Sequence, residues 1–259
     1  MSMAPQSPRS ESVIEFRDVE CVSGGRKILC ALNLAINGGE ILVLLGRSGS
    51  GKTTALKLVN RLLTVSRGEI RVDGRDVKDW DVIKLRRHIG YAIQDVGLFP
   101  HYTVERNIGL ILSLERWDKE KIYARVQELL RLAGLNPDLA ARYPNQLSGG
   151  QRQRVGVARA LAADPPILLM DEPFGALDPL TRADLQREFL SLQRKLQKAV
   201  LFVTHDLHEA LRLGSRIALL EAGKLVAVGS PEEFLGSSDP LVKKYVEAFG
   251  SLEEARGKK

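Results

Sequence analysis

Short apolar runs alternate with amphipathic segments along most of the chain. The runs cover residues 41–45, 167–170, 200–204 and 216–220, and each has the length of a buried strand. Helical periodicity fills residues 181–196 and a shorter segment that begins at Leu207. Strands that alternate with helices in this order predict an α/β fold built on a parallel sheet.

The remaining pattern divides the chain into further parts. We predict a helix over residues 52–63, strands near 69–73, 89–93 and 224–229, and two short helices within 231–249. An apolar stripe at helical spacing indicates core packing in a mainly helical insertion; it consists of Ile122, Val126, Leu129, Leu130 and Ala133. We therefore expect a disordered lead (1–12), an α/β core (13–94 and 155–230), a helical insertion (95–154) and a helical tail (231–259).

A glycine-rich loop directly follows the first of these apolar runs. Its pattern is G-x-x-x-x-G-K-[ST], filled here by Gly46, Arg47, Ser48, Gly49, Ser50, Gly51, Lys52 and Thr53, with Thr54 next in the predicted helix. Such a loop turns backbone N–H groups toward one anion, and its lysine and hydroxyl suit the β- and γ-phosphates and Mg²⁺. A simple turn between a strand and a helix would not require Lys52 and Thr53, so the pattern predicts a nucleoside triphosphate site.

A second glycine-rich segment precedes another predicted helix. Ser148 stands at the N-cap position, and Gly149, Gly150 and Gln151 follow it. Unhindered N–H groups at a helix start can bind an anion, although a Ser-Gly-Gly cap alone could simply start the helix without binding any ligand. Two such sites in one chain favour phosphate binding at both.

Two carboxylates end the apolar run 167–170. Adjacent strand residues point to opposite faces, so Asp171 and Glu172 could divide the work. We expect Asp171 in the Mg²⁺ shell and Glu172 as the base for an attacking water. The alternative is a solvated acidic turn with no catalytic role, but the presence of the phosphate loop in the same chain favours the catalytic role.

These segments resemble the ATP-binding-cassette (ABC) ATPases, and the resemblance extends over residues 13–229. Three more residues match the family's motifs: Gln94 the Q-loop, Asp178 the D-loop and His205 the switch histidine. The resemblance implies a P-loop NTPase (RecA-like) core with a parallel sheet, an antiparallel β subdomain and a helical insertion. It also implies ATP and Mg²⁺, and a head-to-tail dimer that holds ATP between one subunit's 46–53 loop and the other's Ser148 and Gly150.

The chemistry of two of these matches supports them independently. Gln94 has both donor and acceptor groups, so it could contact a metal-bound water and sense motion of the neighbouring subdomain. His205 follows an apolar strand, which would place its imidazole beside the γ-phosphate as a donor. We therefore group Gln94 and His205 with Glu172 as candidate catalytic residues, and Gln94 also with Thr53 and Asp171 as candidate metal ligands.

Two further stretches, 57–62 and 90–104, look like those of bacterial importer subunits for glycine betaine, carnitine, choline or proline. The resemblance implies membrane permease partners, a solute-binding protein and a place on the cytoplasmic face of the plasma membrane. Many such subunits carry a further pair of CBS domains, which we do not expect in this chain. The family usually stacks an aromatic residue on adenine, yet the aligned position is Ser23, so we expect weaker discrimination of the base.

Composition and cysteine spacing bear on the partners that we expect for this chain. The formal charge of +6 is modest and mixed with acidic residues, and 5% of residues are aromatic, so we expect no nucleic-acid partner. Neither cysteine, Cys21 or Cys30, has metal-ligand spacing, and we expect both to be reduced. The alternatives are an ABC importer ATPase for another small solute and, less in keeping with the length, a soluble ABC ATPase that acts on nucleic acid or ribosomes.

Overall fold

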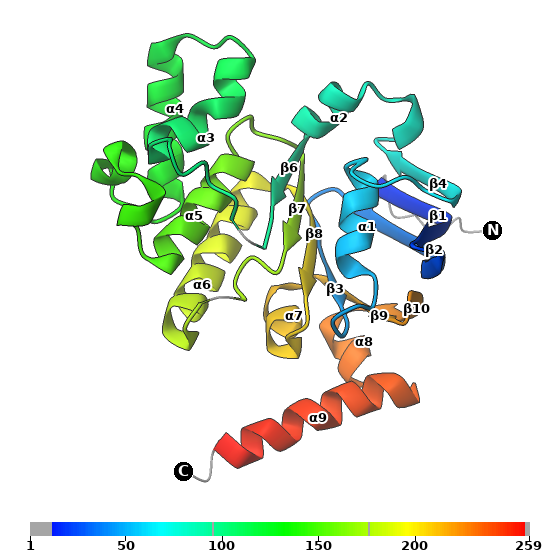
Figure 1. Cartoon of the computed structure of the whole chain (residues 1–259). Coiled ribbons are helices and arrows are strands. Elements are labelled where there is room, and N and C mark those ends of the chain that lie inside the picture. Colours follow the sequence, from blue (N-terminus) through cyan, green and yellow to red (C-terminus); the bar gives the residue numbers. More distant parts are fainter. Residues whose placement is uncertain (1–11, 95, 176, 257–259) are drawn as a thin grey trace, which may run out of the picture.

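A six-stranded sheet forms the centre of the molecule (Figure 1). The computed structural model describes residues 12–94, 96–175 and 177–256. The strand order is β10-β9-β3-β8-β7-β6, and all neighbours are parallel except β10, which runs antiparallel to β9. The predicted parallel α/β sheet is confirmed, with strands β3 (Ile41–Leu45), β6 (Ile89–Ala92), β7 (Ile167–Asp171), β8 (Ala199–Thr204), β9 (Arg216–Glu221) and β10 (Lys224–Gly229).

Strand β3 is buried on both faces of this sheet, which explains its unbroken apolar sequence. Its alternate side chains enter two separate cores: Val43 packs in one and Leu42 and Leu44 in the other. One core is covered by helices α3 (Val104–Leu114), α4 (Lys119–Leu132), α5 (Gly149–Ala160), α6 (Pro179–Leu196) and α7 (Leu207–Leu213). The other is covered by α1 (Lys52–Val59), α2 (Val82–His88) and a smaller sheet.

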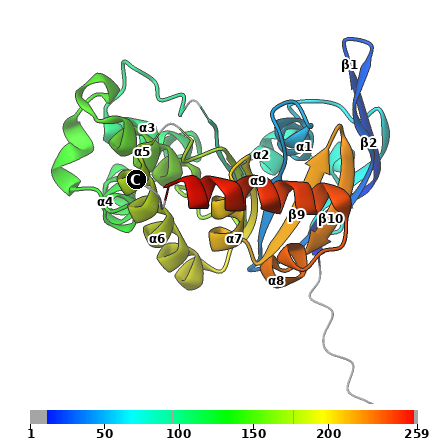
Figure 2. The same cartoon turned by 90° about the horizontal axis from the view of Figure 1, so that it is seen from below.

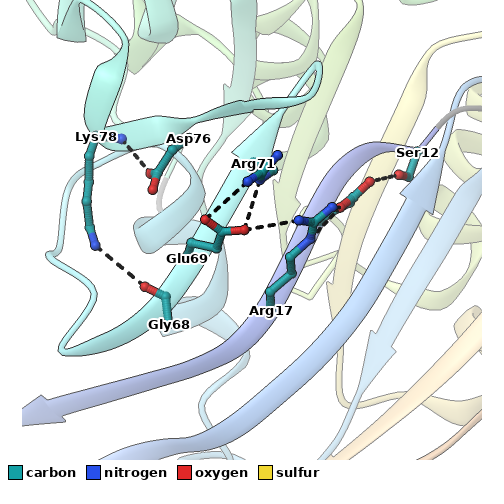
Figure 3. Close-up of polar contacts among 8 residues, drawn as sticks. Ser12, Arg17, Gly68, Glu69, Arg71, Asp76 and Lys78 are labelled. Carbon is teal, nitrogen blue, oxygen red and sulfur yellow. Dashed lines mark hydrogen bonds and ion pairs between the residues drawn. The ribbon is translucent and has the colours of Figure 1, made fainter.

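The smaller sheet is antiparallel, as expected, with order β2-β1-β4-β5. Its strands are β1 (Ser12–Ser23), β2 (Arg26–Asn37), β4 (Arg67–Val72) and β5 (Arg75–Asp76). An ion pair joins neighbouring strands on its surface: the Arg17 guanidinium of β1 lies 3.1 Å from the Glu69 carboxylate of β4 (Figure 3). Arg71, also on β4, lies 2.9 Å from the same carboxylate. Water screens such exposed pairs, so the apolar side chains beneath them hold this sheet. Cys21 and Cys30 are both free thiols, as expected.

Two predicted helix bounds are wrong. The helix expected over 52–63 ends at Val59, because Arg61 adopts a left-handed conformation with φ of 49° and donates a hydrogen bond to the carbonyl of Trp80 at 2.8 Å. Leu62 and Leu63, which suggested a longer helix, are partly exposed. The two short helices expected within 231–249 are α8 (Pro231–Leu235) and a much longer α9 (Pro240–Arg256).

Helices α3, α4 and α5 gather beside the β6 edge of the large sheet (Figure 1). The predicted stripe packs there: Val126, Leu129 and Leu130 are buried, and Ile122 and Ala133 pack against them. Helix α5 continues through residue 154, where we expected the helical insertion to end. Ser12, expected to be the last residue of the disordered lead, begins β1, and the other residues of that lead, 1–11, lie outside the described residues. In the described part of the chain, no helix has the length and apolar character needed to cross a membrane.

A fully buried amide organises the segment that leads into α3. The Asn107 amide group donates hydrogen bonds to the carbonyls of Phe99 at 3.1 Å and Tyr102 at 3.0 Å. Its oxygen accepts one from the Phe99 N–H at 2.8 Å. The bonds to the Phe99 N–H and the Tyr102 carbonyl pair backbone groups of this loop, so Asn107 fixes the chain between Gln94 and α3.

Asn107→Ala should therefore lower the free energy of unfolding by about 2–3 kcal/mol, because several buried groups would lose their partner together. Urea denaturation of the variant and the parent measures the difference. Ser113→Ala, an exposed change on the same helix, should shift it by less than about 1 kcal/mol. An Asn107 variant as stable as the control would mean that water replaces these bonds without cost.

Candidate functional site

The glycine-rich loop occupies the sharp passage from β3 into α1. Gly51 has φ of 106° and precedes the helix, a conformation that favours glycine. At Gly46 a side chain would collide with the fold, since an added Cβ would lie 2.2 Å from the Leu220 carbonyl oxygen. Arg47, Ser48 and Gly49 lie exposed at the end of the sheet, and Thr54 follows in α1.

Ser50 and Lys52 are buried within this loop. Ser50 is 4% exposed, and its hydroxyl oxygen has no partner among the described residues. Lys52 is 5% exposed, and its ammonium group donates to the carbonyls of Gly46 at 2.7 Å and Arg47 at 2.8 Å. An unpartnered hydroxyl and a buried cation beside free N–H groups are the surroundings that a phosphate chain requires.

Burial lowers the pKa of Lys52, and the negative charges of Glu172, Asp171 and Glu221 oppose that shift. The negative charges of these three carboxylates thus favour the charged form of the ammonium, which is bonded to the two carbonyls. Two of these carboxylates were predicted from the sequence as site residues. Glu221, at the end of β9, was not predicted, because nothing in its local sequence connects it with the loop.

Thr53 and Asp171 meet across the sheet edge. The Thr53 hydroxyl donates to Asp171 Oδ1 at 3.0 Å, although the two residues are far apart in sequence. Burial raises the pKa of Asp171, and the Thr53 hydrogen bond opposes the rise. No group of three or more His, Cys, Asp or Glu in the described residues could hold a metal by itself. The pair therefore suits Mg²⁺, which takes a few protein oxygens and fills its other positions with phosphate oxygens and water.

Glu172 and His205 form the second pair at this edge. His205 Nδ1 lies 3.0 Å from Glu172 Oε2. The sequence suggested that Asp171 and Glu172 are neighbours on one extended strand, but β7 ends at Asp171, and Glu172 turns left-handed with φ of 43°. The Glu172 N–H donates to the carbonyl of Val203 at 3.0 Å, so the turn is held by β8. An uncommon conformation held in this way aims the carboxylate toward His205.

The second glycine-rich segment begins α5. The Ser148 hydroxyl accepts a hydrogen bond from the Gln151 N–H at 3.2 Å, and the Gln151 side chain accepts one from the Ser148 N–H at 2.9 Å. This reciprocal pair is a capping box, and it leaves the N–H groups of Gly149 and Gly150 at the helix start. Helix α5 and helix α1 lie on opposite sides of β7 and β8 (Figure 1), so the chain does not bring Ser148 to its own phosphate loop.

Gln94 and Asp178 are the two remaining residues that the sequence predicts for the site. Gln94 is exposed and lines a cavity of about 430 Å³ together with Leu98 and with Gly149 from the segment that begins α5. Asp178 caps α6: its carboxylate accepts from the Thr181 N–H at 3.0 Å, and hydrogen bonds from Thr181 lower its pKa. Both residues thus lie in segments that connect the sheet with helices beside it: Gln94 follows β6, and Asp178 lies between β7 and α6.

Tyr91 is a further neighbour that sequence reasoning missed. It belongs to β6, beside β7, and burial and the nearby Asp171 carboxylate raise the pKa of its hydroxyl. The phenol therefore stays neutral and presents a hydrogen-bonding group next to Asp171. Its place in an apolar strand shortly before Gln94 was the available signal.

Comparisons with known proteins agree with this geometry. A family model described as ABC transporter matches residues 29–175. The glycine betaine/carnitine/choline transport ATP-binding protein of Bacillus subtilis is 50% identical over 226 residues, which are 87% of this chain and 59% of that protein. The glycine betaine uptake system ATP-binding protein of Escherichia coli is 51% identical over 219 residues, 85% of this chain and 71% of that protein. The chain thus spans about 59% of the length of the first of these relatives.

Solved structures give the same result. A dimeric ATP-binding cassette in a post-hydrolysis state bound to ADP and Pi matches with a TM-score of 0.76 and 35% identity, covering 84% of this chain and 98% of that one. A cassette protein of Clostridium perfringens, part of an ABC transporter complex, matches with a TM-score of 0.81 and 25% identity over 94% of this chain and 99% of that one. The expected cassette fold is confirmed.

Lys52→Ala should weaken binding of Mg-ATP by about 1.5–3 kcal/mol, roughly 10- to 150-fold, because it removes the buried charge at the phosphate loop. Isothermal titration gives the affinity. Lys84→Ala removes the same charge from an exposed position on α2 and should leave it unchanged. Equal affinities for both variants would show that the 46–53 loop does not hold the phosphates.

Proposed function

Because the chain belongs to the ABC transporter family, we propose that it is the ATP-hydrolysing subunit of a membrane importer. One observation carries the proposal: the chain joins Lys52, the Thr53–Asp171 pair and the Glu172–His205 pair at one edge of a parallel sheet. A phosphate-binding cation, a pair of metal ligands and a candidate base then lie within one site. This combination suits phosphoryl transfer to water.

The nucleotide would be held mainly through its phosphates. The N–H groups of the 46–53 loop and the Lys52 ammonium would bind the β- and γ-phosphates. Thr53 and Asp171 would hold Mg²⁺, with Gln94 as a further ligand. When bound, the ion neutralises charge on the phosphate oxygens. The unpartnered Ser50 hydroxyl supports this assignment, since it offers another group to the phosphate chain.

Glu172 would accept the proton of the attacking water. The water oxygen then forms a bond to the γ-phosphorus while the bond to the β-phosphate oxygen breaks, which yields ADP and phosphate. His205 supports this role because an N–H at its Nδ1 would orient the Glu172 carboxylate, and an imidazole with a proton on both nitrogens would also donate from Nε2 toward the γ-phosphate. Removing such a base typically costs a factor of 10²–10⁴ in rate.

A second copy of the chain would complete the site. Ser148 and the N–H groups of Gly149 and Gly150 face outward at the start of α5, on the other side of the sheet from their own phosphate loop. A head-to-tail partner would bring this helix start to the γ-phosphate, with Gln151 securing the cap and Asp178 near the junction. The dimeric solved relative supports this arrangement.

Membrane permease subunits would be the remaining partners, on the cytoplasmic face of the plasma membrane, with a solute-binding protein acting through them. The cavity beside Gln94 and Leu98 suits a cytoplasmic helix of the permease, because Asn107 holds the chain that follows it. The relatives' names point to quaternary amine osmoprotectants such as glycine betaine, choline and carnitine as the solute. Proline, a secondary amine that is a zwitterion like glycine betaine, is a further candidate.

Glu172→Gln should hydrolyse ATP at least about 100-fold more slowly and accumulate as a dimer in Mg-ATP, because the phosphate contacts remain while the base is lost. Size-exclusion chromatography and phosphate release measure the two effects. The double variant Glu172→Gln, Ser148→Arg should bind ATP as a monomer, since the larger side chain fills the partner's phosphate site. Near-normal turnover in the single variant would remove Glu172 from its role, and a dimer of the double variant would contradict the head-to-tail arrangement.

Ser23→Tyr should strengthen ATP binding by up to about 1–3 kcal/mol with little change in kcat, because it offers a ring for the base to stack on. Ser23 ends β1 at an exposed hairpin turn, and the sole aromatic residue of β1 and β2, Phe16, is buried. Competition of GTP with ATP should show poor discrimination in the parent and in the Ser23→Ala control. A strong ATP preference that the tyrosine leaves unchanged would mean that another residue covers the base.

A further inference from the structure

Helix α9 lies across the sheet edge that carries the proposed nucleotide site. Figure 1 shows it beneath the sheet, and the view from below in Figure 2 shows it crossing from the β9 and β10 side toward α6. It packs against α7, α8 and β10 near its start, where Val242 is fully buried. The Asp239 carboxylate accepts hydrogen bonds from the N–H groups of Leu241 and Val242, so this end of the helix is anchored.

Further along, Tyr245 connects α9 with the phosphate loop. Its hydroxyl donates to the Glu221 carboxylate at 3.3 Å, and the Arg47 backbone also hydrogen-bonds to it. Burial and the Glu221 charge together raise the pKa of Tyr245, which keeps the phenol neutral and able to donate. The negative charge of Glu221 also favours the charged form of Lys52 by raising its pKa. Tyr245 therefore bonds to a carboxylate that influences the lysine of the phosphate loop.

A cavity of about 360 Å³ separates the helix from the loop. One side is formed by Gly46, Arg47, Ser48 and His205, and the other by α9 through Lys244, Tyr245 and Ala248. The loop side holds the N–H groups and the histidine proposed to bind the γ-phosphate. Helix α9 therefore stands on the side of the nucleotide site that faces away from the sheet.

In the proposed dimer, the partner's Ser148 and Gly150 would reach the γ-phosphate over the exposed residues 47–49 of the loop, because the sheet closes off its other side. Two segments cannot fill one volume, because protein interiors are close-packed. We infer that α9 is an autoinhibitory latch, which occupies the docking place of the partner subunit's helix start and must leave the loop before the ATP-bound dimer can close. The inference rests on the head-to-tail dimer of the proposed function.

The contacts suit a latch that opens. The part of α9 near the loop is held by the Tyr245 hydroxyl, by partly buried Tyr245 and Val246, and by the rim of an open cavity, whereas the anchored end is held by fully buried Val242. Breaking hydrogen bonds to a partly exposed phenol has a modest cost, since water replaces them. If the latch is closed in most molecules, the apparent monomer–dimer Kd rises, because only the fraction of molecules with an open latch can dimerise.

The test measures dimerisation in the Glu172→Gln background with saturating Mg-ATP, by sedimentation over a range of protein concentrations. Tyr245→Phe removes the hydroxyl and keeps the ring, and Lys244→Ala with Tyr245→Ala removes both side chains from the cavity wall. Each should lower the monomer–dimer Kd at least threefold. Lys243→Ala changes the adjacent exposed lysine, which does not line the cavity, and should leave the Kd unchanged.

An unchanged or higher Kd in both Tyr245 variants, with the parent dimerising normally, would overturn the latch alone. If the parent and every variant stay monomeric in Mg-ATP, the dimer itself is refuted and the latch with it. Hydrogen exchange adds a second readout: amides of residues 244–248 should exchange faster when Mg-ATP is added to Glu172→Gln, and not when Ser148→Arg is also present. Equal protection in the two proteins would contradict displacement of α9.

Discussion

Strand β3 is the element on which the site depends. It lies between β8 and β9 in parallel register, with Leu45 opposite Thr204, and β7 pairs with β8 so that Asp171 lies opposite Val203. Parallel strands share their direction, so the segments that leave β3, β7 and β8 emerge at one edge. The phosphate loop, the Asp171–Glu172 turn and His205 meet there for that reason.

Burial on both faces gives this arrangement its rigidity. The side chains of β3 alternate between two cores, and each fully buried aliphatic side chain contributes about 1.5–3 kcal/mol relative to exposure. A one-residue slip of β3 would exchange the two sets and displace the loop after it. The tight passage at Gly46, where a side chain would meet the Leu220 carbonyl, shows how closely the neighbouring strand approaches.

Electrostatics at the edge follow from the same packing. Lys52 begins α1, whereas Asp171 and Glu221 end β7 and β9. Burial strengthens the interactions among these charges relative to an exposed surface. Burial disfavours the charged forms of both Lys52 and Asp171, whereas their mutual attraction and the Thr53 hydrogen bond favour them. The site thus holds charges that a bound phosphate and cation would compensate.

The sequence by itself determined the types of the elements and the residues placed at their ends. Apolar runs predicted the central strands, and the glycine pattern with Lys52 and Thr53 marked the phosphate loop, because local spacing reflects strand and helix periods and the needs of an anion. Resemblance to a family supplied the antiparallel sheet and the roles of Gln94 and Asp178.

Only the tertiary structure decided the contacts between distant segments. The end of the helix at Val59 follows from the turn at Arg61 and its bond to Trp80, and the left-handed turn of Glu172 follows from its bond to β8. Neither contact is local, so periodicity could not indicate it. The same holds for Tyr245: its helix was expected, but its place over the phosphate loop depends on how α9 packs against the finished sheet edge.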